Sequence, residues 1–124
     1  MTREDRVQEF LNFAGEPTFE VVWACIAEEY QELQEAAVKF HEIIASDFED
    51  DVKANARANF VKEWADCQYV LSQLALFYNI PGEEAFNRVA ENNMTKVQGG
   101  EIIRREDGKI MKPEGYLPPD MGGL

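Results

Sequence analysis

The fold is decided by two acidic motifs, Glu28-Glu29-Tyr-Gln-Glu32 and Glu63-Trp-Ala-Asp66. Around both motifs, apolar residues recur at the three- and four-residue spacing of a helix, which predicts long helices over about residues 18–45 and 49–79. At about 100° per residue, Glu29 falls at the edge of the first apolar stripe and Glu63 falls inside the second. The acidic side chains of the two helices are therefore expected to face each other.

Carboxylates that face an apolar core are costly unless a cation, a shared proton or a hydrogen-bonding network compensates their charge. The two helices and their link contain few basic residues, namely Lys39, Lys53, Arg57 and Lys62. Acids at i, i+3 spacing on two helices match the all-oxygen ligands that Mg²⁺ prefers, with Mn²⁺ as the alternative. The two motifs therefore predict a divalent-metal site.

The net charge of this 124-residue chain is −12, and it is distributed unevenly. Residues 1–95 hold 19 acidic and 7 basic side chains, whereas residues 96–124 hold 5 of each. Such an acidic body argues against nonspecific binding to nucleic acid or to an anionic membrane. An anionic ligand would need metal ions to approach the acidic motifs, and the basic residues of the tail are candidates to contact phosphate.

Neither a membrane span nor an export signal is expected. No apolar run approaches the roughly 18 residues that cross a bilayer, and the first residues, Met-Thr-Arg-Glu-Asp, lack an apolar signal core. Cys25 and Cys67 are too far apart in sequence for a CxxC site, so reduced core cysteines are expected. These features predict a cytoplasmic protein.

Two shorter helices are expected on either side of the long pair. Thr2-Arg-Glu-Asp5 has the form of a capping box, and it opens a helix that Gly15 ends. Asn79-Ile-Pro-Gly82 stops the third helix, and a fourth follows from Glu83 to about Thr95. The predicted fold class is therefore all-α, with a four-helix bundle over residues 1–98.

Residues 99–124 are predicted to form a short hairpin and an extended tail of the same domain. Asp107-Gly108 lies between two short β-prone runs, which is a strong hairpin signal. The two long helices present more apolar face than two short helices can cover. We therefore expect a homodimer or a homotetramer that completes the bundle.

The acidic motifs resemble the signature of a known superfamily. Glu28-Glu29-x-x-Glu32, then about thirty residues, then Glu63-x-x-Asp66 is similar to the pattern of the all-α nucleoside triphosphate pyrophosphatases, the MazG-like and phosphoribosyl-ATP-pyrophosphatase-like proteins. The later run Glu91-Asn-Asn93-Met-Thr-Lys96, with the tail that follows it, resembles the C-terminal part of one branch found in bacteria and phages. The similarity spans most of the chain and implies a MazG-like bundle.

The resemblance implies a hydrolase that cleaves a nucleoside or deoxynucleoside triphosphate between the α and β phosphates, releasing the monophosphate and pyrophosphate. In the superfamily, the matching acids of both motifs hold the metal, and Glu28 would orient or deprotonate the attacking water. The metal ligands implied here are Glu29, Glu32, Glu63 and Asp66.

The resemblance also implies substrate contacts at the end of the fourth predicted helix. In relatives, the position of Asn93 and Lys96 binds metal or phosphate, so both are candidate substrate ligands. Arg104, Arg105, Lys109 and Lys112 are further candidates to close over the pyrophosphate. A solvated hairpin is the alternative for those four residues.

A non-catalytic acidic helical protein is the competing interpretation. The same scaffold would then sense nucleotide, or its acidic body would mimic DNA and occupy a basic partner. DNA mimicry requires acids spaced along the exposed surface, whereas the acids of these motifs are expected to face inward. The enzymatic interpretation is therefore favoured.

Overall fold

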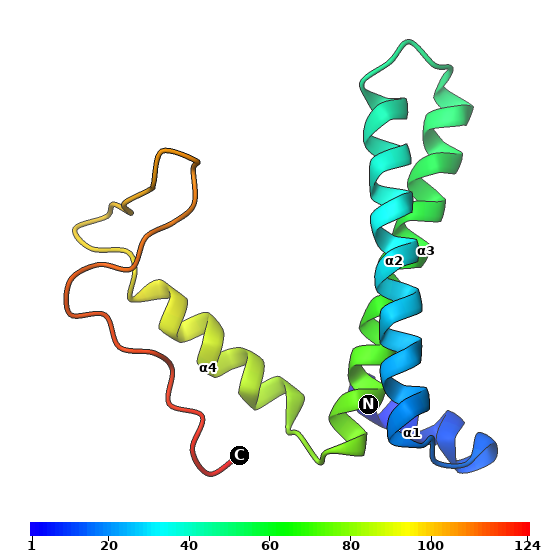
Figure 1. The fold of residues 1–124 in the computed structure, drawn as a ribbon, viewed down its shortest axis with the longest axis horizontal. Coiled ribbons are helices and arrows are strands. Elements are labelled where there is room, and N and C mark those ends of the chain that lie inside the picture. Colours follow the sequence, from blue (N-terminus) through cyan, green and yellow to red (C-terminus); the bar gives the residue numbers. More distant parts are fainter. The chain divides into compact units, whose positions relative to one another are not determined.

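The computed structural model describes residues 1–124 as four helices and a non-helical tail (Figure 1). The helices are α1 (Arg3–Ala14), α2 (Phe19–Ile44), α3 (Asp50–Phe77) and α4 (Gly82–Met94). No strand forms, and the only β pairing is two isolated bridges. The all-α class predicted from the sequence is confirmed. None of the four helices combines the length and the hydropathy needed to cross a bilayer.

Local sequence explains where the first helices begin and end. The Thr2 hydroxyl accepts a hydrogen bond from the Asp5 amide at 3.0 Å, and the Asp5 carboxylate accepts one from the Thr2 amide at 2.8 Å, so the predicted capping box is present. Gly15, with φ of 85°, ends α1 in a conformation that other residues rarely adopt. At the start of α2, the Thr18 hydroxyl accepts a hydrogen bond from the Val21 amide at 3.3 Å.

The chain forms two compact units, Met1–Asn79 and Ile80–Leu124. The first unit holds α1, α2 and α3, and the second holds α4 and the tail. At the boundary, Asn79 has φ of 55°, a left-handed conformation that Asn tolerates better than most residues. The division into compact units falls before α4, and the predicted organisation, a helical domain over residues 1–98 with residues 99–124 as its tail, stays a prediction.

In the first unit, α2 and α3 run antiparallel side by side, and α1 packs against α3 (Figure 1). The rings of Phe40 and Phe60 stack across the α2–α3 pair, with centroids 5.4 Å apart. The buried apolar residues are few: Val7, Leu11, Val22, Ala36, Val70 and Ala75. The antiparallel pairing places the middle of α2 beside the middle of α3, where the acidic motifs lie.

The second unit contains the predicted turn but no extended hairpin. The Gly108 amide donates to the Arg105 carbonyl at 2.9 Å, and the Arg105 amide donates to the Lys109 carbonyl at 2.8 Å, so the chain reverses at Asp107-Gly108. Beyond the turn, pairing is limited to one isolated bridge, between Arg104 and Ile110. An isolated two-stranded hairpin is marginally stable in water, which accounts for the absence of strands.

Candidate metal centre

α2 and α3 bring three of the predicted carboxylates together. Oxygen atoms of Glu29, Glu32 and Glu63 lie within 4.8 Å of one another, and we call these three residues the acidic cluster. Glu63 is only 9% exposed, Glu29 is half-buried and Glu32 is exposed. Because Glu29 and Glu32 are one helical turn apart, both reach the same side of α2, where Glu63 of α3 meets them. The cluster therefore lies at the margin of the core with one side open to solvent.

Two oxygens of the acidic cluster are buried without a hydrogen-bond partner, Oε2 of Glu29 and Oε2 of Glu63. An unpartnered buried carboxylate oxygen costs free energy, and a cation would compensate both. Mg²⁺ binds carboxylate oxygens at about 2.1 Å, so two oxygens on one ion are at most about 4.2 Å apart. The three oxygens already lie within 4.8 Å of one another, so small side-chain rotations would satisfy this limit. The residues present therefore fit a Mg²⁺ or Mn²⁺ ion.

The negative charges of the acidic cluster act on one another. The nearby Glu29 carboxylate is the main reason that the pKa of Glu32 is raised above its ordinary value, with partial desolvation and the charge of Glu63 adding to the shift. A raised carboxyl pKa means that ionising Glu32 is opposed by its neighbours. This mutual repulsion is what a bound divalent cation would relieve.

Cys67 supports the acidic cluster from α3 without joining it. Its thiol donates a hydrogen bond to the backbone carbonyl of Glu29 at 3.2 Å, which ties α3 to α2 at the cluster. Burial raises the pKa of the Cys67 thiol, and the charge of Glu29 raises it further, so the thiol stays protonated and keeps this bond. Both cysteines are free, as the sequence predicts.

Asp66 lies outside the acidic cluster and is engaged by a neighbouring lysine. The Lys62 ammonium lies 2.8 Å from Asp66 and 3.4 Å from Glu63. The hydrogen bond to Asp66 is the main reason that the pKa of Lys62 is raised above its ordinary value. The i, i+4 spacing of Lys62 and Asp66 was a sequence signal for this ion pair. For Asp66 to bind metal, its carboxylate would have to leave Lys62, and its role as a ligand stays a prediction.

The predicted water-activating residue, Glu28, is exposed on α2. It precedes Glu29 directly, so its side chain leaves the helix about 100° away from the neighbouring cluster member. No hydrogen bond or ion pair within the protein engages its carboxylate. Glu28 is therefore available to contact water, and its catalytic role stays a prediction.

The predicted substrate contacts all lie in the second unit. The Lys96 ammonium donates a hydrogen bond to Asn93 at 3.0 Å, which brings this predicted pair together. Arg104 donates instead to the carbonyl of Gly108 at 2.8 Å, within the turn. Arg105 likewise pairs with Asp107 at 2.7 Å, and Lys109 is exposed. Lys112, also a predicted phosphate contact, lies with Lys96 over the ring of Tyr116, and the sequence pattern did not indicate this grouping.

Comparison with known sequences agrees with this acidic helical architecture. Residues 4–93 match the sequence profile of phosphoribosyl-ATP pyrophosphohydrolase (PRA-PH), a match that includes both acidic motifs and covers most of the chain. The chain belongs to the phosphoribosyl-ATP pyrophosphohydrolase family. This family is part of the MazG-like all-α superfamily, so the resemblance noted in the sequence is confirmed. No curated protein matches the chain.

Membership in the phosphoribosyl-ATP pyrophosphohydrolase family supports a nucleotide pyrophosphohydrolase activity in general. Hydrolases of this family typically depend on a divalent metal, and the chain supplies an acidic cluster that fits one. The match ends at residue 93 and therefore does not extend over the tail.

Proposed function

We propose that this protein is a Mg²⁺-dependent pyrophosphohydrolase that cleaves a nucleoside or deoxynucleoside triphosphate between its α and β phosphates. The acidic cluster is the observation that carries the proposal, because its three carboxylates converge within 4.8 Å and two of their buried oxygens lack a partner. Membership in the phosphoribosyl-ATP pyrophosphohydrolase family supports the reaction type. The inward position of Glu63 also disfavours DNA mimicry, which requires exposed acids.

In the proposed reaction, a water oxygen bonds to the α phosphorus and the bond from that phosphorus to the bridging oxygen breaks. Bound Mg²⁺ would neutralise charge on the phosphates and on the leaving pyrophosphate. Glu29, Glu32 and Glu63 would hold the ion, joined by Asp66 after its release from Lys62. Glu28 would orient the attacking water and accept its proton, which its exposed carboxylate is free to do.

The phosphate contacts of the proposal come from the second unit. Lys96 is the best supported, because its ammonium has only the neutral Asn93 side chain as a hydrogen-bond partner and keeps its charge available for an anion. Arg104 and Arg105 would have to exchange their bonds within the turn for bonds to phosphate. Lys109 is exposed and needs no such exchange.

We also propose that the chain forms a homodimer or a homotetramer. Phe13 is 93% exposed, and Tyr30 and Val38 are each 59% exposed, so large apolar side chains of α1 and α2 lack cover. Exposed apolar surface of this kind is typical of an interface between subunits. Light scattering after size-exclusion chromatography is expected to give two or four times the 14.2 kDa of one chain. An active monomer would contradict this part of the proposal.

Pyrophosphate release from the eight common NTPs and dNTPs, and from phosphoribosyl-ATP, tests the proposed function. At least one triphosphate is expected to yield its monophosphate and pyrophosphate with Mg²⁺ or Mn²⁺, and none is expected to do so in EDTA. If phosphoribosyl-ATP is the only compound hydrolysed, the proposed substrate class is wrong and phosphoribosyl-ATP replaces it. Release of orthophosphate instead of pyrophosphate would contradict cleavage at the α–β bond. Nucleotide binding without any hydrolysis would favour the sensing alternative.

A further inference from the structure

The tail folds back along one face of α4. Arg88 and Asn92 are four residues apart on that helix, and Lys96 follows four residues later in the turn at its end, so the three side chains succeed one another along one side. The tail passes them in reverse order, with its last residues at Arg88 and residues 116 and 117 at Asn92. The second unit is therefore a helix with its own tail held antiparallel to it (Figure 1).

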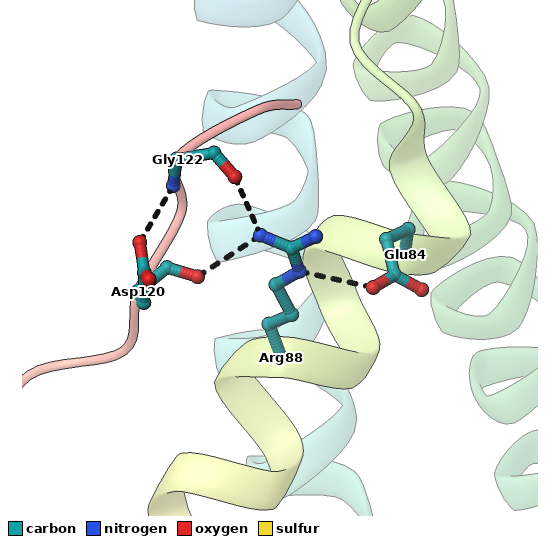
Figure 2. A network of polar contacts seen from close by, with 4 residues as sticks. All are labelled: Glu84, Arg88, Asp120 and Gly122. Carbon is teal, nitrogen blue, oxygen red and sulfur yellow. Dashed lines mark hydrogen bonds and ion pairs between the residues drawn. The ribbon is translucent and has the colours of Figure 1, made fainter.

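Arg88 holds the end of the tail. Figure 2 shows its guanidinium between Glu84 and the tail backbone. Its Nη1 donates to the carbonyl of Gly122 at 2.8 Å and to that of Asp120 at 3.2 Å, while its Nε donates to Glu84 at 2.9 Å. Because the tail contacts are to backbone carbonyls, they fix the path of the chain whatever side chains it carries. Glu84 fixes the guanidinium itself.

Asn92 holds the middle of the tail and orients Tyr116. Its amide donates to the carbonyl of Leu117 at 2.8 Å, and its side-chain oxygen accepts a hydrogen bond from the Tyr116 hydroxyl at 2.7 Å. Both polar atoms of the Asn92 side chain are thus used on the tail. The neighbouring Asn93 accepts the hydrogen bond of the Lys96 ammonium.

The ammonium groups of two lysines lie over the ring of Tyr116. The Lys96 Nζ lies 5.7 Å from the ring centroid and the Lys112 Nζ lies 5.4 Å from it, both within the range of cation–π attraction. These two distances place the ammonium groups no more than about 11 Å apart, so their like charges repel, and the attraction of each group to the ring offsets part of that repulsion. Neither ammonium has a carboxylate partner, although the second unit contains eight acidic side chains. The pair therefore presents unneutralised positive charge in an acidic protein.

We propose that Lys96, Lys112 and Tyr116 form a diphosphate clamp, in which the two ammonium groups contact adjacent phosphates and the ring of Tyr116 keeps them together. A diphosphate suits the clamp because two neighbouring phosphates offer acceptors to both ammonium groups and relieve their repulsion. Arg88 and Asn92 are positioning residues, because they hold Tyr116 and the tail on α4. That the diphosphate belongs to a nucleotide or is its released product rests on the proposed function.

Titration calorimetry of the full chain with sodium pyrophosphate, in EDTA and at low ionic strength, tests the clamp without metal. Wild-type protein is expected to bind pyrophosphate, and Lys112→Gln is expected to weaken binding about tenfold. Lys96→Gln should have a similar effect. Lys39→Gln is the matched control, because Lys39 is exposed on α2 and makes no ion pair. Unchanged affinity in both clamp variants, or no binding by wild-type protein, would overturn the clamp.

Two outcomes separate the clamp from the proposed function. Wild-type protein that hydrolyses nucleotide with Mg²⁺ but does not bind pyrophosphate would overturn the clamp alone. Pyrophosphate binding that depends on Lys112, without any hydrolysis, would support the clamp and overturn the proposed function alone. A triphosphate with a methylene group in place of the α–β bridging oxygen is titrated in parallel. Weakened binding of this analogue in Lys112→Gln assigns the clamp to the nucleotide, and weakening for pyrophosphate alone assigns it to the product.

Substitutions at Tyr116 separate the ring from the hydroxyl. Tyr116→Phe keeps the ring and loses only the bond to Asn92, so pyrophosphate affinity should fall by no more than about threefold. Tyr116→Leu removes the ring and should weaken binding about tenfold. Arg88→Met should release the tail from α4. Amide hydrogen exchange over residues 115–122 should then increase, and pyrophosphate binding should weaken in the same variant. Equal affinities for Tyr116→Leu and wild-type protein would show that the ring does not organise the site.

Discussion

Glu63→Gln is expected to lower the rate of pyrophosphate release more than about a hundredfold, because even supporting residues around metal ligands cost ten- to a hundredfold when lost. The same variant should melt at the wild-type temperature or above it when no metal is present. Glu63 is 9% exposed and its Oε2 has no partner, so the substitution removes a poorly compensated buried charge. Steady-state kinetics with Mg²⁺ and thermal melting in EDTA measure the two effects separately.

The opposite directions of the two effects distinguish a metal ligand from a structural residue. Glu42→Gln is the matched control, since Glu42 is exposed near the end of α2 and outside the acidic cluster. It should leave both turnover and melting temperature near the wild-type values. Asp66→Asn provides a second variant at the predicted site. Full turnover in Glu63→Gln would refute the assignment, and a large fall in its melting temperature would show that Glu63 is mainly structural.

Mg²⁺ should raise the melting temperature by about 5 °C or more at a concentration near one hundred times its Kd, since binding to the folded state alone then adds about 2.7 kcal/mol. The physical source is relief of repulsion in the acidic cluster and satisfaction of its two unpartnered oxygens. Differential scanning calorimetry with MgCl₂, compared with NaCl at equal ionic strength, measures the shift. Glu29→Gln and Glu63→Gln should each abolish most of it.

Lys62→Met tests whether Asp66 joins the metal site. In the wild-type protein, the Lys62 ammonium pairs with the Asp66 carboxylate at 2.8 Å. If Asp66 is a metal ligand, removing this ammonium should strengthen Mg²⁺ binding and enlarge the rise in melting temperature that Mg²⁺ causes. An unchanged shift in Lys62→Met would exclude Asp66 from the ligand set. Equal shifts in wild-type protein and Glu63→Gln would instead contradict the metal centre itself.

The helices were predictable from the sequence because their signals are local. The capping box of Thr2 and Asp5, the glycine at position 15 and the apolar spacing of the long helices act within one or two turns of the chain. The hairpin prediction was only partly met, since Asp107-Gly108 makes the turn but nothing beside it stabilises strands. The residues of a turn determine its conformation locally. A stable strand also needs a further strand or helix to pack against, and the local sequence does not specify one.

The acidic cluster was predictable in part, because helical spacing places Glu29 and Glu32 on one side of α2 and turns Glu63 toward the apolar face of α3. Which carboxylates actually converge depends on the register of two antiparallel helices. The periodicity of either helix alone does not define that register. Asp66 therefore shares a motif with Glu63 and yet pairs with Lys62.

The sequence by itself determined four helices, their approximate ends and the inward position of Glu63, because these follow from backbone capping and from which helix face avoids water. Only the tertiary structure decided that the Tyr116 hydroxyl bonds to Asn92 and that the ammonium groups of Lys96 and Lys112 lie over the Tyr116 ring. Those contacts join residues up to 24 positions apart along an irregular tail. The sequence of an irregular tail has no periodicity that predicts its contacts. The path of this tail depends on the hydrogen bonds that side chains of α4 donate to the tail backbone.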